Sequence, residues 1–213
     1  MKQLLFRVCI SLFAAAALAP AQDLKTILLP PAQTDIGKPF MQTLKLRSSS
    51  RSFDTKPLPM QQLSNLLWAA DGINRPESGK RTAPTAMNWQ EVDVYVVLKE
   101  GAFLYQAKSH GLEPVTSKDL REATGRQEFT KEAPLNLVYV SDRARMSKAS
   151  DEHKMLWGGA DIGFIAQNVY LFCASEGLAV VVRGMVNREV LAPALKLRPD
   201  QKIVLAQTVG YPR

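Results

Sequence analysis

The sequence predicts an α+β domain with a mainly antiparallel sheet. Helical and strand-like segments follow one another without the strict alternation that parallel sheets require. Hydrophobic residues make up 46% and charged residues 22% of the 213-residue chain, which is typical of a globular protein with a substantial core. The length suits one domain, or one domain preceded by a leader.

The first 21 residues have the pattern of a secretory signal peptide. Lys2 and Arg7 precede an apolar run over 8–19, and Ala19-Pro20-Ala21 fits an A-x-A cleavage site. The run is well below the roughly 20 apolar residues of a spanning helix. We therefore expect no stable membrane insertion, and a mature protein that is periplasmic or secreted.

Residues 22–38 contain several prolines and no periodicity, and they predict an extended N-terminal arm before a domain over 39–213. Apolar spacing, start and stop residues predict the elements that follow. The predicted helices are 40–46, 59–71, 117–125 with Ser117 as its N-cap, 151–176 before Gly177, and 187–197 capped by Asn187. The predicted strands are 92–98, 102–107, 133–142, 178–184 and 202–212. Helix 151–176 is apolar nearly all round, which predicts a position in the middle of the core.

Charge and reactive residues exclude several classes of function. The formal charge is +7, or 25 basic against 20 acidic residues once the leader is removed, but the basic residues are scattered, so we expect no nucleic-acid partner. The two histidines, His110 and His153, lie far apart, which argues against a metal site or a serine-histidine triad. Cys173, in an apolar run, is expected to be a small buried side chain.

One polar cluster stands out, "RSSSR" at 47–51. Arginine forks suit phosphate, and serine hydroxyls suit phosphate or polyol oxygens. By itself the cluster fits a phosphoryl-binding loop and a solvated turn between helices equally well.

Five ordered segments over 40–213 make the chain resemble the nitroreductase family of flavin-dependent oxidoreductases. They are "RSSSRSF" at 47–53, "APTAMNWQEVDVYVVL" at 83–98, "GRQEFTKEAPLNLVYV" at 125–140, "DIGFIAQNVYLFCASEGLAVVVRGMV" at 161–186, and "GYP" at 210–212. The matches look closer to the branch that contains thiazoline and oxazoline dehydrogenases.

The resemblance implies a nitroreductase-like fold, an intertwined homodimer and FMN as cofactor. Electrons would pass in ping-pong order from NAD(P)H to a nitroaromatic, quinone or similar acceptor, with no catalytic side chain and no metal. By position, Arg47, Ser48 and Ser49 would hold the phosphate and ribityl chain, and Arg51 the edge of the flavin ring. The other implied cofactor-binding residues are Gln127, Arg183, Gly184 and Arg213, with Pro84, Thr85 and Asn88 coming from the partner subunit.

Two alternatives stay open. The same fold could bind flavin or another ligand without turnover, and this would show as a bound flavin that NAD(P)H does not reduce. A basic surface-binding module would instead bind polyanions in a salt-dependent way and take up no flavin.

Overall fold

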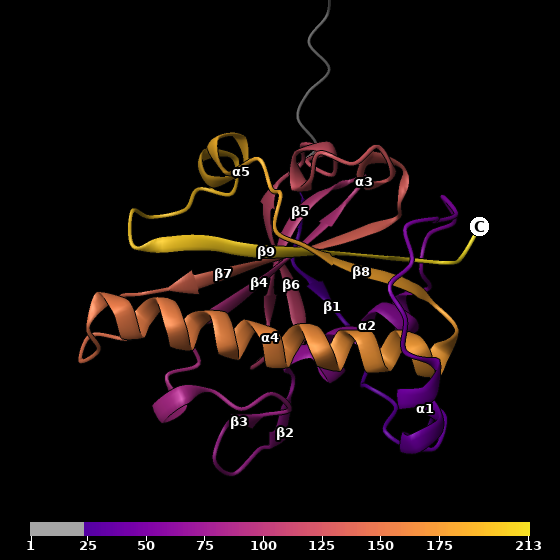
Figure 1. Cartoon of the computed structure of the whole chain (residues 1–213), viewed down its shortest axis with the longest axis horizontal. Coiled ribbons are helices and arrows are strands. Elements are labelled where there is room, and N and C mark those ends of the chain that lie inside the picture. Colours follow the sequence, from indigo (N-terminus) through magenta and orange to yellow (C-terminus); the bar gives the residue numbers. More distant parts are fainter. Residues whose placement is uncertain (1–23) are drawn as a thin grey trace, which may run out of the picture.

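The computed structural model describes residues 24–213 of the chain, so the predicted leader over 1–21 lies outside the described part. Figure 1 shows a twisted sheet with helices on both faces. α1, α2 and α4 lie on one face, and α3 and α5 lie on the other. The sequence-based α+β prediction is confirmed.

The sheet has seven strands in the order β1-β6-β5-β4-β7-β9-β8, and every neighbouring pair is antiparallel. A separate hairpin pairs β2 with β3. The strands are β1 Ile27–Leu28, β2 Ile73–Arg75, β3 Lys80–Arg81, β4 Val92–Leu98, β5 Gly101–Gln106, β6 Gly111–Thr116, β7 Leu135–Asp142, β8 Ala179–Arg183 and β9 Gln201–Gly210. Since β8 is the last strand on its side, its outer edge is available to other parts of the chain.

Helices α1, α2, α4 and α5 each start within one residue of the prediction, whereas α3 was not predicted. The helices are α1 Phe40–Leu46, α2 Met60–Asp71, α3 Phe129–Glu132, α4 Asp151–Glu176 and α5 Arg188–Ala194, with 3₁₀ turns η1 Ala86–Asn88 and η2 Glu122–Thr124. Ser150 caps α4 by accepting a hydrogen bond from the His153 N–H, and Gly177 ends it with a left-handed φ of 72°.

Alternation along the central strands sends side chains to two cores. In β4, Val94 and Val96 face the core shared with α2 and α4, whereas Tyr95 and Val97 face the core shared with α5. Cys173 is fully buried in the first core, as expected. Both faces of β4 and β7 are therefore covered by other elements. A ligand would have to bind at the strand ends or on the outer elements.

The prediction that 151–176 runs through the middle of the core is wrong for the single chain. The helix lies across one face of the sheet, so only one stripe of it can reach the core. Ile162 and Ile165 are fully buried, whereas Trp157 is 40% and Phe164 47% exposed. Part of its apolar surface is left without a contact in this chain.

The prediction of a helix over 117–125 is also wrong, because only the turn η2 forms. The Asp119 carboxylate accepts hydrogen bonds from the backbone N–H and the guanidinium of Arg121. Such local bonds offer the backbone an alternative to a helix. The sequence reading also missed β1, β6 and the β2–β3 hairpin, which are short or contain a proline.

Candidate functional site

The segment Arg47–Phe53, here called the Arg-Ser loop, lies along the outer edge of β8. The Ser50 N–H donates to the carbonyl oxygen of Val180 over 2.9 Å. Phe53 forms a β-bridge with Pro212, and the next N–H, of Asp54, donates to the Tyr211 carbonyl over 2.8 Å. These bonds hold the loop backbone on the sheet edge while its polar side chains face outward.

Four polar side chains of the loop remain available for a ligand. Arg51 and Ser48 are exposed, and neither Arg47 nor Arg51 is ion-paired to an acidic side chain of residues 24–213. The guanidinium of Arg47 lies 5.5 Å from the ring centre of Tyr170, and Ser49 Oγ lies 3.0 Å from the Tyr170 hydroxyl. A loop with two unpaired cations and adjacent hydroxyls can bind a phosphate.

The next two predicted site residues are Arg183, which ends β8, and Gly184, which follows it. They differ in their exposure. The guanidinium of Arg183 points into the protein, where it donates to the Thr124 carbonyl, Asn136 Oδ1 and Thr208 Oγ1 over 2.5–2.9 Å. Burial lowers its pKa to about 10. Gly184 is exposed, and a Cβ there would meet only Leu205, at 4.0 Å. Arg183 therefore supports the site from inside, and Gly184 presents open backbone.

Gln127 and Arg213 lie on elements next to this strand end. Gln127 lines a cleft of about 970 Å³ between residues 119–131 and 186–190, and its Oε1 is buried without a hydrogen-bond partner. Arg213 lies 3.7 Å from Glu132 at the end of α3. Phe53 of the Arg-Ser loop stacks on Phe129 of α3, with ring centres 5.2 Å apart. The fold thus gathers the Arg-Ser loop, the end of β8, α3 and the C-terminus.

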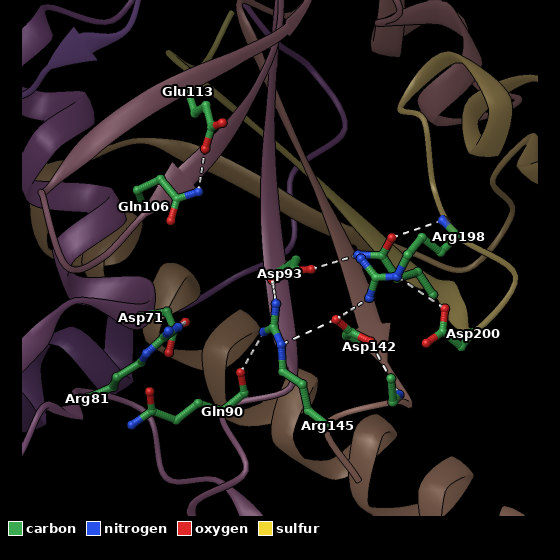
Figure 2. A network of polar contacts seen from close by, with 12 residues as sticks. Asp71, Arg81, Gln90, Asp93, Gln106, Glu113, Asp142, Arg145, Arg198 and Asp200 are labelled. Atoms are coloured by element: carbon green, nitrogen blue, oxygen red, sulfur yellow. Dashed lines mark hydrogen bonds and ion pairs between the residues drawn. The ribbon is translucent and has the colours of Figure 1, made fainter. Parts of the chain in front are cut away.

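Pro84, Thr85 and Asn88 lie elsewhere, in the segment around η1. The Ala86 N–H donates to Asp161 Oδ2 of α4 over 2.9 Å. Figure 2 shows Arg145 reaching the other end of the segment, where it donates to the Gln90 carbonyl over 2.9 Å and to Asp93 over 2.8 Å. Both ends of the segment are held, and Pro84 and Asn88 are exposed.

The two groups of residues are anchored at different points of α4. The Arg-Ser loop contacts Tyr170, and the η1 segment contacts Asp161, nine residues earlier, or roughly 13 Å along a helix. One chain therefore presents two separate sets of predicted cofactor ligands.

Comparison with known proteins identifies the family. The family described as the Nitroreductase family matches residues 44–211, which is most of the chain and includes both groups of ligands. The chain belongs to the nitroreductase family. A curated relative, a candidate nitroreductase of Methanocaldococcus jannaschii, is 27% identical over 180 residues, covering 77% of this chain and 90% of the relative.

Solved structures agree with this assignment. A candidate nitroreductase of Ralstonia eutropha JMP134 superimposes with a TM-score of 0.86 at 43% identity, covering 92% of this chain and 93% of the other. A chain of the Escherichia coli microcin synthetase McbBCD complex has a TM-score of 0.70 at 18% identity, covering 94% and 85%, and shows the shared fold alone. The nitroreductase-like fold predicted from the sequence is confirmed.

A cluster of buried acids lies beneath the η1 segment. Burial raises the pKa of Glu91 to about 7, and the neighbouring Asp161 carboxyl adds to the effect. Burial likewise raises the pKa of Asp71 to about 7, against the opposing charge of its ion-pair partner Arg81. Glu91 is completely buried, and neither of its carboxyl oxygens accepts a hydrogen bond from a donor in the described chain. Burial therefore favours the protonated forms of these carboxyl groups, and loss of charge reduces the repulsion between them.

The reading of the sequence missed two residues that shape the site. Asp161 lies in the segment 161–186 that resembles the family, but the sequence prediction assigned it no function. An aspartate in an otherwise apolar helix indicates that its carboxylate has a polar partner. Tyr170 gave no such signal, because a tyrosine in an apolar helix is expected to be a buried core side chain. Among residues 24–213 no group of three or more His, Cys, Asp or Glu side chains is arranged to hold a metal ion, and no helix is long and apolar enough to cross a membrane.

Proposed function

We propose that this member of the family is an FMN-dependent oxidoreductase that passes electrons from NAD(P)H to a nitroaromatic, quinone or similar acceptor. The observation that carries the proposal is the Arg-Ser loop, whose unpaired cations and hydroxyls lie along the edge of β8, the strand that ends just before Gly184. Bound FMN would supply the hydride chemistry, and the chain would bind, orient and shield it.

The residues present fit FMN. Arg47, Ser48 and Ser49 offer charge and donors to the phosphate and ribityl chain. Arg51 would lie at the pyrimidine edge of the ring, where a cation favours the reduced, anionic form. Gly184 is exposed and leaves space for a planar ring, since a Cβ at this position would approach only Leu205, at 4.0 Å.

The remaining ligands complete this arrangement. Gln127 has a buried Oε1 without a partner, and its side-chain amide could serve the pyrimidine edge. Arg213 would add charge near the phosphate in competition with Glu132. Arg183 would act indirectly, by fixing the chain around Thr124 and the end of β8.

A second copy of the chain would bring Pro84, Thr85 and Asn88 to the site. The apolar side chains exposed on α1 and α4 support such a homodimer. They are Phe40, Met41, Leu44, Leu46, Met155, Leu156, Trp157 and Phe164. An apolar surface of this kind on neighbouring helices is typical of a protein–protein contact. Gly159 and Gly163 of α4 have open space at their Cβ positions, which would allow close approach of a partner.

The proposal is tested by FMN titration of the purified protein, followed by anaerobic reduction with NADH and NADPH. Because a charge-assisted hydrogen bond contributes about 1.5–3 kcal/mol, Arg47→Ala should weaken FMN binding about tenfold to a hundredfold. Arg51→Ala should affect affinity less but lower the reduction potential of the bound flavin. Lys202→Ala, an exposed change at the far end of β9, serves as the control.

Each result decides between the functions. If both arginine variants bind FMN like the parent, with unchanged potential, the loop is a solvated turn and the proposed site is wrong. If FMN binds but neither nicotinamide reduces it, the protein is a flavin-binding protein without this turnover. Salt-sensitive polyanion binding without flavin would indicate a basic surface-binding module.

The proposal also covers the export of the protein and the branch of the family to which its substrate belongs. We propose cleavage of the leader after Ala21 and a periplasmic or secreted location, and N-terminal sequencing of the exported protein checks this. We also propose, from the resemblance of its sequence motifs, that the chain is nearer the thiazoline and oxazoline dehydrogenases than the classical nitroreductases. A test of thiazoline oxidation beside nitroaromatic reduction addresses that choice.

A further inference from the structure

Tyr170 lies where α4, β8 and the Arg-Ser loop meet. Its hydroxyl oxygen is 2.9 Å from the Val182 backbone nitrogen and 3.0 Å from Ser49 Oγ. Its ring faces the guanidinium of Arg47 at 5.5 Å, within the range of a cation–π contact. One side chain therefore touches the sheet edge and two predicted phosphate ligands.

The bond with Val182 has a fixed direction, and it leaves the Tyr170 hydroxyl able to donate to Ser49. A backbone N–H can only donate, so the Tyr170 hydroxyl accepts from Val182. The single phenol proton is then free to be donated to Ser49 Oγ. With that oxygen accepting, the hydroxyl proton of Ser49 is left to point away from Tyr170.

A serine held in this way is a donor to its surroundings. Ser49 is exposed, so a proton that points away from Tyr170 is accessible to a ligand bound at the loop. Phosphate oxygens at neutral pH mainly accept hydrogen bonds. The bond from Tyr170 thus sets Ser49 as a phosphate donor, whereas an unconstrained hydroxyl would lose rotational freedom on binding.

We propose that Tyr170 is a positioning residue that orients the Ser49 hydroxyl toward the phosphate of the cofactor. This inference rests on the proposed binding of FMN at the Arg-Ser loop. It assigns Tyr170 a part in affinity for the phosphate, beyond its part in holding α4 against β8.

The test compares FMN with riboflavin, which has the same ring and ribityl chain but no phosphate. Tyr170→Phe keeps the ring under Arg47 and removes only the hydroxyl. We expect it to weaken FMN binding about fivefold to tenfold, as for the loss of one hydrogen bond of modest strength. Riboflavin binding should stay within twofold of the parent.

A double-mutant comparison tests the route through Ser49. Ser49→Ala should lower FMN affinity at least as much as Tyr170→Phe, and the double variant should bind no more weakly than Ser49→Ala. Tyr211→Phe is the matched control, because Tyr211 also donates to a side chain, Gln62, and faces a cation, Lys56, away from Ser49. It should leave FMN affinity unchanged.

The outcomes separate this inference from the proposed function. If the parent binds no FMN, both are wrong. If the parent binds FMN through Arg47 and Tyr170→Phe binds it equally well, only the role of Tyr170 is wrong. Equal losses for FMN and riboflavin, or additive losses in the double variant, would mean that Tyr170 supports the fold without orienting Ser49. Thermal unfolding of each variant ensures that titrations are made on folded protein.

Discussion

Replacing Arg183 by methionine tests the interior support of the proposed site. The residue is 5% exposed, and no carboxylate pairs with it among residues 24–213. Its guanidinium instead donates hydrogen bonds to three neutral groups, on Thr124 of η2, Asn136 of β7 and Thr208 of β9. Methionine fills a similar volume but donates no hydrogen bond.

The size of the effect follows from the groups left behind. The Thr124 carbonyl loses its guanidinium donor, and a buried polar group without a partner costs about 1–3 kcal/mol. Asn136 Oδ1 keeps a second donor, the Thr208 hydroxyl at 2.6 Å, so its loss is smaller. Removal of a buried charge offsets part of the total. We expect Arg183→Met to lower the free energy of unfolding by about 2–4 kcal/mol.

Urea unfolding of the parent and the variant measures this difference. Arg188→Met is the control, because Arg188 also donates to backbone carbonyls, those of Ile203 and Val204, but is exposed, so water can replace it. The control should change stability by less than about 1 kcal/mol. If the two variants lose the same amount, burial of the Arg183 network is not what stabilises the β8 end.

A neighbouring glycine gives a second check on the same reasoning. A Cβ at Gly125 would collide with the Arg183 guanidinium. The φ of Gly125 is −171°, which any residue adopts, so the requirement is for space alone. Gly125→Ala should therefore be destabilising in the parent and better tolerated beside Arg183→Met. Equal effects in both backgrounds would contradict the assigned contact.

Three further predictions concern titration, assembly and reactivity. Glu91 has a folded-state pKa of about 7, raised by burial above an ordinary 4.5, so its contribution to stability is complete below about pH 4.5 and is lost as the pH rises toward 7. The loss is at most about 1.4 kcal/mol per pH unit for one proton, and Glu91→Gln should flatten this slope in urea unfolding at pH 5–8; an unchanged slope would exclude Glu91 as its source. Phe164→Asp, on the exposed apolar stripe of α4, should convert the proposed homodimer to a monomer in sedimentation experiments, whereas a parent that is already a folded monomer would contradict the dimer. Burial raises the pKa of the Cys173 thiol, so a thiol reagent should modify it only on unfolding, and rapid labelling of the native protein would show that the core opens.

Elements whose ends carry local signals could be predicted from the amino-acid sequence. Pro59 and Gly72 flank α2, and Ser150 and Gly177 flank α4. Residues of these types favour helix ends through local backbone effects, which do not depend on the rest of the chain. Strands β4 and β7 were also predictable, since Val, Leu and Tyr fill most of their positions. The ordered motifs fixed the family, which the comparisons confirm.

The contacts between polar groups, in contrast, depend on how the whole chain folds. Local spacing carries no information on the partner of a side chain more than 100 residues away, such as Ser49 for Tyr170. Nor could it show that Arg183, the last residue of β8, turns inward, because its partners Thr124, Asn136 and Thr208 come from other parts of the chain. The burial of α4 was likewise beyond the sequence: an apolar helix indicates that it needs covering, and the fold determines that the sheet covers only one side.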